Sequence, residues 1–210
     1  FVEGSHHRHI ADKFNKLATG EITRLIVNMP PRHTKSEFAS FLLPSWMVGR
    51  EPKLKIIQTT HNAELAVRFG RKAKNLIDSD DYQKIFKTTL QEDSKAAGRW
   101  ETSQGGEYFA AGVGGAITGR GADLLIIDDP HSEQDALSPT ALESAYEWYT
   151  SGPRQRLQPG GKIVLVMTRW SIKDLTAKLV ANQKEPKSDQ WHVVEFPALL
   201  DHGPVWPEYW

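Results

Sequence analysis

Short apolar runs alternate with segments of helical periodicity along most of this chain, and this alternation restricts the folds that it can adopt. The apolar runs predict strands at 24–29, 53–59, 107–111, 123–127, 162–167 and 191–196. The periodic segments predict helices at 36–48, 62–77, 142–149 and 172–181. We expect Pro44 to bend or shorten the first helix and Asn62 to cap the second. Strands separated by helices form βαβ units, so we expect an α/β fold whose central sheet is mostly parallel and flanked by helices.

The composition is that of an ordinary globular domain. Of the 210 residues, 39% are hydrophobic, and Lys plus Arg equal Asp plus Glu at 26 each, which argues against disorder and against a protein that coats DNA through bulk charge. Cysteine is absent, which excludes disulfides, thiolate zinc sites and a cysteine nucleophile. The longest apolar stretches, 124–127 and 163–167, are far shorter than the ~20 residues of a membrane helix.

Charge is distributed unevenly along the chain. Residues 1–100 carry a net charge of +6 and residues 101–210 a net charge of −6. A basic front half could meet phosphates and an acidic back half could hold a metal ion, although solvated helix faces would give the same asymmetry.

Three smaller features concern local structure. His6, His7 and His9 are expected on an amphipathic N-terminal helix rather than at a metal. The Gly105-Gly106 pair is expected in a hairpin turn rather than in a phosphate loop. The chain begins with Phe rather than Met, and its tail (201–210) is rich in Pro and Trp, so we expect a piece of a longer protein that ends at the start of a linker.

The segment NMPPRHTKS, residues 28–36, lies between an expected strand and an expected helix. A phosphate-binding P-loop needs a lysine and a hydroxyl residue where a helix begins, because free backbone N–H groups, the lysine and a hydroxyl-bound Mg²⁺ together hold the phosphates. Lys35-Ser36 meets that need, but Met29 and Thr34 replace the two glycines of the usual pattern. The alternative is a proline-stiffened turn followed by a helix cap.

The segment LLIIDDP, residues 124–130, is an apolar strand that ends in two carboxylates. In a Walker B arrangement Asp128 would hold the Mg²⁺ shell, and Asp129 would polarise the water that attacks the terminal phosphate. Glu133 is a rival for the second role, and an acidic turn after a core strand is the alternative for the whole segment. The Lys-Ser and Asp-Asp pairs, each closing a predicted strand, indicate a nucleotide site more specifically than either pair does alone.

Two further polar segments have possible roles at such a site. Arg120 lies between glycines, which suits an arginine finger that reaches a neighbouring subunit's γ-phosphate, or simply a surface arginine in a turn. Thr168 and Arg169 end a strand about 40 residues after the acidic pair. Thr168 could sense the γ-phosphate there, and the alternative is a strand end whose Arg169 pairs with Trp170.

Together, MPPRHTKS, GVGGAITGRGADLLIIDDP and VLVMTRW resemble the large terminase subunit of tailed bacteriophages, and the resemblance covers nearly the whole chain. It implies a RecA-like P-loop ATPase domain (expected here at 1–200) of the additional-strand type, which drives DNA packaging with ATP and Mg²⁺. The nuclease domain of that family would lie beyond the linker.

The resemblance also implies roles for individual residues. Phosphate-loop positions correspond to Pro31, Arg32, His33, Thr34, Lys35 and Ser36. Lys35 would contact the phosphates, and Ser36 with Asp128 would hold Mg²⁺. Asp129 takes the position where many relatives have Glu, Arg120 resembles the trans-acting finger, and Thr168 with Arg169 resembles the motif that couples hydrolysis to DNA movement.

The implied partners are double-stranded DNA contacted without sequence preference, a portal protein, a small terminase subunit and further copies of the chain in a ring. The implied location is the host cytoplasm, docked on a procapsid, with the isolated domain a monomer. A helicase-like ATPase, or a nucleotide-binding assembly module with a degenerate P-loop, are the alternatives.

Overall fold

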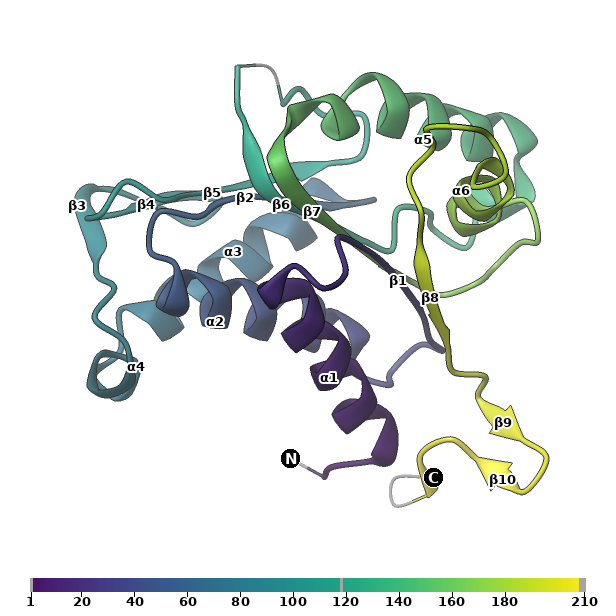
Figure 1. Ribbon diagram of the computed structural model, residues 1–210, viewed down its shortest axis with the longest axis horizontal. Coiled ribbons are helices and arrows are strands. Elements are labelled where there is room, and N and C mark those ends of the chain that lie inside the picture. Colours follow the sequence, from purple (N-terminus) through teal and green to yellow (C-terminus); the bar gives the residue numbers. More distant parts are fainter. Residues whose placement is uncertain (1, 118, 208–210) are drawn as a thin grey trace.

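A computed structural model describes residues 2–117 and 119–207. Eight strands form one sheet in the order β3-β4-β5-β2-β6-β7-β1-β8 (Figure 1). Their bounds are Arg24–Asn28 (β1), Lys55–Thr60 (β2), Leu90–Ala96 (β3), Arg99–Thr102 (β4), Glu107–Gly112 (β5), Ala122–Asp128 (β6), Leu157–Met167 (β7) and His192–Glu195 (β8). The six strands from β5 to β8 pair in parallel, which confirms the expected α/β fold.

Helices cover both faces of the sheet (Figure 1). On one side lie α1 (Ser5–Thr19), α2 (Leu43–Arg50), α3 (Ala63–Ile77) and α4 (Asp80–Ile85), and on the other α5 (Pro139–Ser151) and α6 (Leu175–Asn182). Alternate residues of β6 serve the two cores: Leu124 and Ile126 pack toward the first group, Leu125 and Ile127 toward the second. Burial on both faces explains why this strand reads as one continuous apolar run.

The expected helix at 36–48 forms in two parts. A π-helix, η1 (Glu37–Leu42), runs directly into α2, where Pro44 occupies the first turn. Proline has no N–H to donate and its ring crowds the carbonyl four residues earlier, so a wider turn before it removes the conflict. Pro44 therefore changes the helix type, whereas the expectation was a bend or a shorter helix.

Two strands of the main sheet, β3 and β4, and the helix α4 were not predicted, nor was the short pair of strands near the C-terminus. The hairpin of β4 and β5 is antiparallel and turns at Gly105-Gly106, as expected, and Trp100 stacks on Tyr108 across it with ring centroids 4.7 Å apart. The N-terminal helix containing His6, His7 and His9 is also confirmed as α1.

The C-terminal segment folds back toward the domain. A two-stranded pair, β9 (Leu199–Leu200) and β10 (Gly203–Pro204), leads to Val205 and Trp206, which are buried. The Trp206 ring lies 4.8 Å from that of His7 on α1. The expected linker residues 208–210 lie outside the described part of the chain, and the boundary at residue 200 stays a prediction. Within the described residues, no helix is long and apolar enough to cross a membrane.

Candidate functional site

Lys35 is the centre of a buried polar cluster at the carboxyl edge of the sheet. Its side chain is 7% exposed and its Nζ lies 2.9 Å from Asp129 Oδ2. The same Nζ donates a hydrogen bond to Thr168 Oγ1, also at 2.9 Å. The sequence predicted these three residues from three separate motifs, and the structure brings them together.

The strand order explains why they meet. In the sheet, β7 lies between β1 and β6, and all three run in parallel. The loop after β1 that carries Lys35, the acidic end of β6 and the Thr168 end of β7 therefore reach the same edge of the sheet. The carboxyl edge of a parallel sheet is where open α/β folds bind ligands.

Asp128 lies directly beneath this cluster and is 1% exposed. Ser36 Oγ donates to its Oδ1 at 2.9 Å, and Ser40 Oγ donates to its Oδ2 at 2.7 Å. Burial, and then the neighbouring carboxylate of Asp129, raise the pKa of Asp128 above its ordinary value, while the two serine hydrogen bonds oppose the rise. A bound cation would favour the ionised form of such a carboxyl.

Ser36 and Asp128 present the hard oxygen ligands that Mg²⁺ prefers. No group of three or more His, Asp or Glu that could hold a metal occurs among residues 2–117 and 119–207. Mg²⁺ is commonly held by one or two carboxylates together with substrate phosphates, so a hydroxyl and a carboxylate suit Mg·ATP better than a self-contained metal site.

Asp129 is fixed by its backbone as well as by its side chain. It has a φ of 42°, in the left-handed region, and its Oδ1 accepts the backbone N–H of Thr168 at 2.7 Å. Its carbonyl accepts the His61 N–H at 3.2 Å. These contacts hold the carboxylate against Lys35.

The phosphate cleft, as we call the hollow over this cluster, has a volume of about 560 Å³. Its lining residues are Pro31, Arg32, Lys35, His61, Asp129, His131, Ser132, Glu133, Gln134, Thr168 and Trp170. Glu133 is exposed at its mouth, within reach of a bound ligand. The second candidate for activating water therefore faces the same space as Asp129.

The loop itself departs from the glycine pattern at a structural cost. Arg32 and Thr34 have φ values of 62° and 68°, a conformation that non-glycine residues adopt with strain. Thr34 stands where the usual pattern has its second glycine, and its Oγ1 lies 2.7 Å from His7 Nε2 of α1. Contacts with the N-terminal helix thus help to hold a threonine where glycine is usual.

Two of the predicted loop residues point their side chains away from the cleft. Thr34 contacts His7, as above, and the His33 Nδ1 lies 2.8 Å from the Pro31 carbonyl with its ring near Trp206. A role for either residue in phosphate binding would have to come from its backbone N–H, which is how P-loops mainly act.

Arg120 is not part of the cluster. It pairs with Glu107 at the start of β5, and its guanidinium carbon lies 4.2 Å from the centre of the Phe109 ring. Since Arg120 precedes β6 and Glu107 begins β5, both lie at the amino edge of the parallel strands, opposite the phosphate cleft. This position excludes contact with the phosphates of its own chain and leaves the role in trans as a prediction. Thr118, beside it in the sequence, lies outside the described residues.

Arg169 lies beside the cleft rather than in it. Its Nε donates to Asp174 Oδ2 at 2.6 Å, and its Nη1 donates to Glu195 Oε1 at 3.2 Å. Asp174 also caps α6 by accepting the Ala177 N–H. Arg169 therefore connects the end of β7 with the start of α6 and the end of β8.

Several residues of the site escaped prediction, among them Ser40, Gln58 and His131. Ser40 and Gln58 are fully buried, and the Gln58 amide donates to Ser40 Oγ at 2.9 Å beneath Asp128. His131, 3% exposed, accepts the Leu175 N–H at the start of α6, and burial lowers its pKa. A glutamine inside an apolar strand and a histidine two residues after the acidic pair were the signals available in the sequence.

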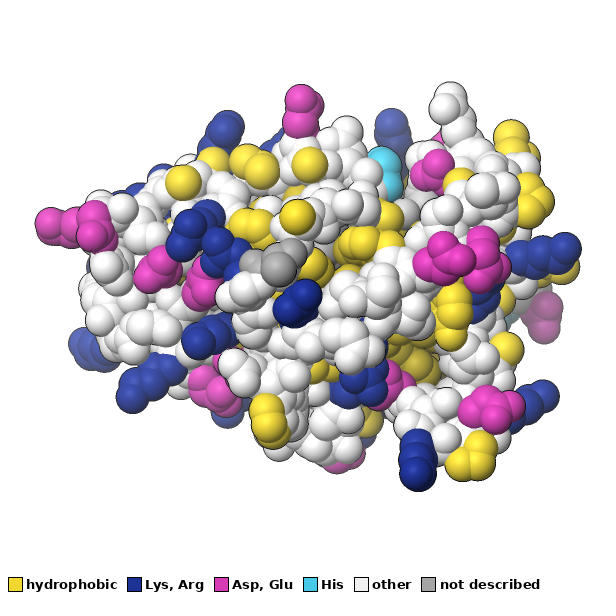
Figure 2. Space-filling model, turned by 90° about the horizontal axis from the view of Figure 1, so that it is seen from above, with side chains coloured by type: hydrophobic (Ala, Val, Ile, Leu, Met, Phe, Trp, Pro, Cys, Tyr) yellow, Lys and Arg dark blue, Asp and Glu magenta, His cyan; other side chains and the backbone are white. Residues whose placement is uncertain are grey.

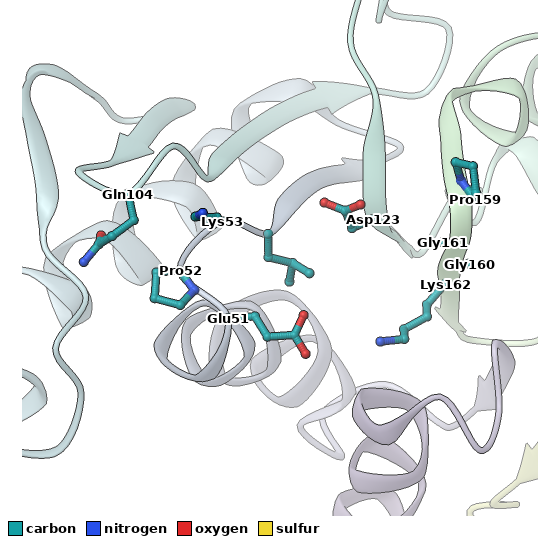
Figure 3. Close-up of a pocket in the computed structure, with 10 residues that line it drawn as sticks. Glu51, Pro52, Lys53, Gln104, Asp123, Pro159, Gly160, Gly161 and Lys162 are labelled. Atoms are coloured by element: carbon teal, nitrogen blue, oxygen red, sulfur yellow. The ribbon is translucent and has the colours of Figure 1, made fainter.

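Another hollow of about 560 Å³ lies at the opposite edge of the sheet (Figure 3). It contains Glu51 and Lys53, which precede β2, together with Asp123 near the start of β6 and Lys162 within β7. The Asp123 carboxylate accepts the Lys55 N–H, and Lys162 Nζ donates to the Ala18 carbonyl. Asp123 and Lys162 thus hold neighbouring backbone segments in place, and no sequence motif points to this hollow.

Of the comparisons with known proteins, only the comparison of structures found a match, and that match concerns the fold. No family model and no curated protein sequence matches the chain. The structure is similar to the crystal structure of the HK97 bacteriophage large terminase, with a TM-score of 0.55 and 16% sequence identity over 88% of this chain. The chain spans 38% of the length of that protein. A likeness at this identity shows that the two share an α/β fold and does not show a shared activity.

Proposed function

We propose that this chain binds Mg·ATP in the phosphate cleft and hydrolyses it as the ATPase of a DNA-packaging motor. The observation that carries the proposal is the contact of Lys35 with both Asp129 and Thr168, directly above the Ser36–Asp128 pair. A lysine, a hydroxyl–carboxylate pair of the kind that holds Mg²⁺, and a second carboxylate that can orient water are groups that phosphoryl transfer to water uses.

In this mechanism the terminal phosphates take the place of Asp129 at the Lys35 ammonium. Asp129, held by the Thr168 N–H, then turns its second oxygen to a water placed in line with the γ-phosphate. Ser36 and Asp128 would hold Mg²⁺, which supplies charge neutralisation at the β- and γ-oxygens. Glu133 is the alternative water-orienting group, because it lines the same cleft.

Thr168 and Arg169 would pass the change at the γ-phosphate to the rest of the domain. Thr168 contacts Lys35 directly, and the next residue, Arg169, is bonded to Asp174 at the start of α6. Loss of the γ-phosphate would alter the contact between Thr168 and Lys35. Because Arg169 is the next residue, its bond to Asp174 would shift as well. Arg120, at the opposite edge, would complete the site of an adjacent copy of the chain and make turnover depend on ring assembly.

The packaging role extends the proposal from ATPase to motor, and its support is the fold shared with the HK97 large terminase. Double-stranded DNA would be contacted through phosphates, with the portal protein and the small terminase subunit as further partners in the host cytoplasm. The face in Figure 2 carries Lys and Arg side chains interspersed with Asp and Glu, so it does not by itself indicate the DNA-binding surface.

The decisive experiment measures binding of a non-hydrolysable ATP analogue and steady-state phosphate release for the wild type and for Lys35→Ala. Loss of the ammonium should abolish both, because the β- and γ-phosphates lose their cation. Lys95→Ala is the matched control, since Lys95 pairs with Asp78 at 3.6 Å on the β3 edge, away from the cleft. Binding and turnover in Lys35→Ala equal to those of the control would contradict the proposal. Analogue binding without hydrolysis, even in the assembled protein, would favour the assembly module instead.

A further inference from the structure

A second hollow, of about 410 Å³, adjoins the phosphate cleft, and we call it the side hollow. Its residues come from the carboxyl ends of β7, β1 and β8, whereas the phosphate cleft lies over the ends of β2, β6 and β7. Pro31 and Thr168 line both. The two hollows are therefore neighbours along the carboxyl edge of the sheet, and the segment that follows β1 lines both of them.

The side hollow differs from the phosphate cleft in chemistry. Apolar side chains make up most of its wall: Met29, Pro30, Pro31, Phe196 and Pro197. Its polar rim is Arg169 and Glu195, whose Oε1 accepts from both Arg169 and the Asn28 amide. An apolar wall with a donor and an acceptor at one edge suits a heteroaromatic ring and does not suit a phosphate.

The path that the rest of a bound nucleotide must take from the phosphate cleft also leads to the side hollow. Its terminal phosphate is assigned to Lys35 and Asp129, at the ends of β6 and β7. The remainder of the nucleotide must then cross the loop after β1, and on the far side of that loop lies the end of β8 with Phe196. We propose that the side hollow binds the base of the nucleotide, stacked on Phe196; this inference rests on the function proposed above.

The Phe196 ring is held in a way that suits this use. It packs at the edge of the first core, and the rings of His6 and His9 contact it at interplanar angles of 66° and 86°. A base would stack parallel to the Phe196 ring, and neither histidine takes that arrangement. Contacts from α1 thus hold the Phe196 ring in place, while the same residue forms part of the wall of the side hollow.

Trp170 is the rival aromatic residue, because it lines the phosphate cleft and is 41% exposed. Its neighbours in that cleft are polar and charged, among them Glu133 and His131. A base stacked there would occupy the space that the water-orienting carboxylates face. The side hollow avoids that conflict, so the geometry favours Phe196.

The test compares two ligands and two substitutions by calorimetry. The ligands are a non-hydrolysable Mg·ATP analogue, which carries the base, and Mg·tripolyphosphate, which does not. Phe196→Leu keeps apolar volume but removes the ring face, and Phe196→Tyr keeps the ring. Phe196→Leu should raise the Kd for the ATP analogue at least about fivefold, the lower end of base-stacking effects. Its Kd for tripolyphosphate should stay within about twofold of wild type, and Phe196→Tyr should bind both ligands like wild type.

Photolabelling of the unmodified chain with 8-azido-ATP provides a check that does not depend on a variant's folding. The label should attach to the peptide that contains residues 192–197. Attachment to the peptide around Trp170 instead would overturn the inference, as would unchanged binding of the ATP analogue by Phe196→Leu. An equal loss of both ligands in that variant would also overturn it, because Phe196 would then act through the phosphate loop.

The proposed function fails in a different way. If Lys35→Ala binds both ligands as tightly as wild type, the phosphate cleft is not the phosphate site, whatever Phe196 does. If Lys35→Ala loses both ligands and Phe196→Leu loses neither, the phosphate site stands and the base site is refuted.

Discussion

Replacing Ser40 by Ala should destabilise the fold far more than the loss of one hydroxyl usually does. Ser40 Oγ donates to the buried Asp128 carboxylate at 2.7 Å and accepts from the Gln58 amide at 2.9 Å. Hydrogen bonds to charged groups contribute about 1.5–3 kcal/mol, and a buried donor left without an acceptor costs about 1–3 kcal/mol. Allowing for local relaxation, we expect the free energy of unfolding to fall by about 2–4 kcal/mol.

Ser45→Ala is the matched control. Ser45 is equally buried, but its Oγ donates to the neutral Phe41 carbonyl one helical turn earlier. That bond duplicates an interaction of the helix backbone, and its loss should cost about 0–1 kcal/mol. Both substitutions change helix propensity in the same way, so the difference between them isolates the bonds to Asp128 and Gln58.

The assay is chemical unfolding of both variants at pH 8 in metal-free buffer, followed by thermal unfolding. For a chain of this size 1 kcal/mol shifts Tm by about 2–4 °C, so Ser40→Ala should melt about 5–15 °C below wild type. Equal losses of stability in Ser40→Ala and Ser45→Ala would refute the reasoning. The hydrogen bond from Ser40 to the buried Asp128 carboxylate would then contribute no more to stability than a bond to a neutral carbonyl.

Two further predictions concern the acidic pair and the arginine at the far edge. Because burial and Asp129 raise the pKa of Asp128, its native form binds extra protons, so its contribution to stability falls as the pH rises from about 4. Asp128→Asn should remove that fall in metal-free urea titrations at several pH values, and an unchanged pH slope would contradict it. Arg120→Ala should bind nucleotide like wild type but lose about 10³–10⁵ in turnover of the assembled ring. Mixing it with Lys35→Ala should restore part of the activity, and no recovery in the mixture would argue against a finger acting in trans.

The central strands and the loop that carries Lys35 could be predicted because they leave local signals. Leu124–Ile127 lies in a parallel strand buried on both faces, so the run is apolar without interruption. Lys35 and Ser36 were expected at a strand-to-helix junction and lie there, even though Thr34 stands where a P-loop usually has glycine; phosphate binding by this loop stays a prediction. These signals also gave the right expectation that Lys35, Asp129 and Thr168 would meet.

The antiparallel end of the sheet could not be predicted in the same way. Strand β3 has one fully buried residue, Leu90, followed by exposed and half-buried polar ones, so it shows neither an apolar run nor a clean alternation. Strand β3 is stabilised instead by its pairing with β4, whose Trp100 is buried.

The residues that support the site depend on tertiary contacts, so no local sequence pattern predicts them either. Ser40 looks like any serine in a helix, and Gln58 like a polar interruption of a strand, until the fold places both under Asp128. The direction of Arg120 is also a tertiary property, because the residue that holds it, Glu107, begins a different strand.

A crystal structure of the chain with Mg²⁺ and a non-hydrolysable ATP analogue tests the central claim most directly. We predict that the terminal phosphate lies between Lys35 Nζ and Asp129, opening their 2.9 Å contact, while Ser36 and Asp128 hold the metal. An analogue found in the opposite hollow, among Lys53, Asp123 and Lys162, with the Lys35–Asp129 pair intact, would contradict it.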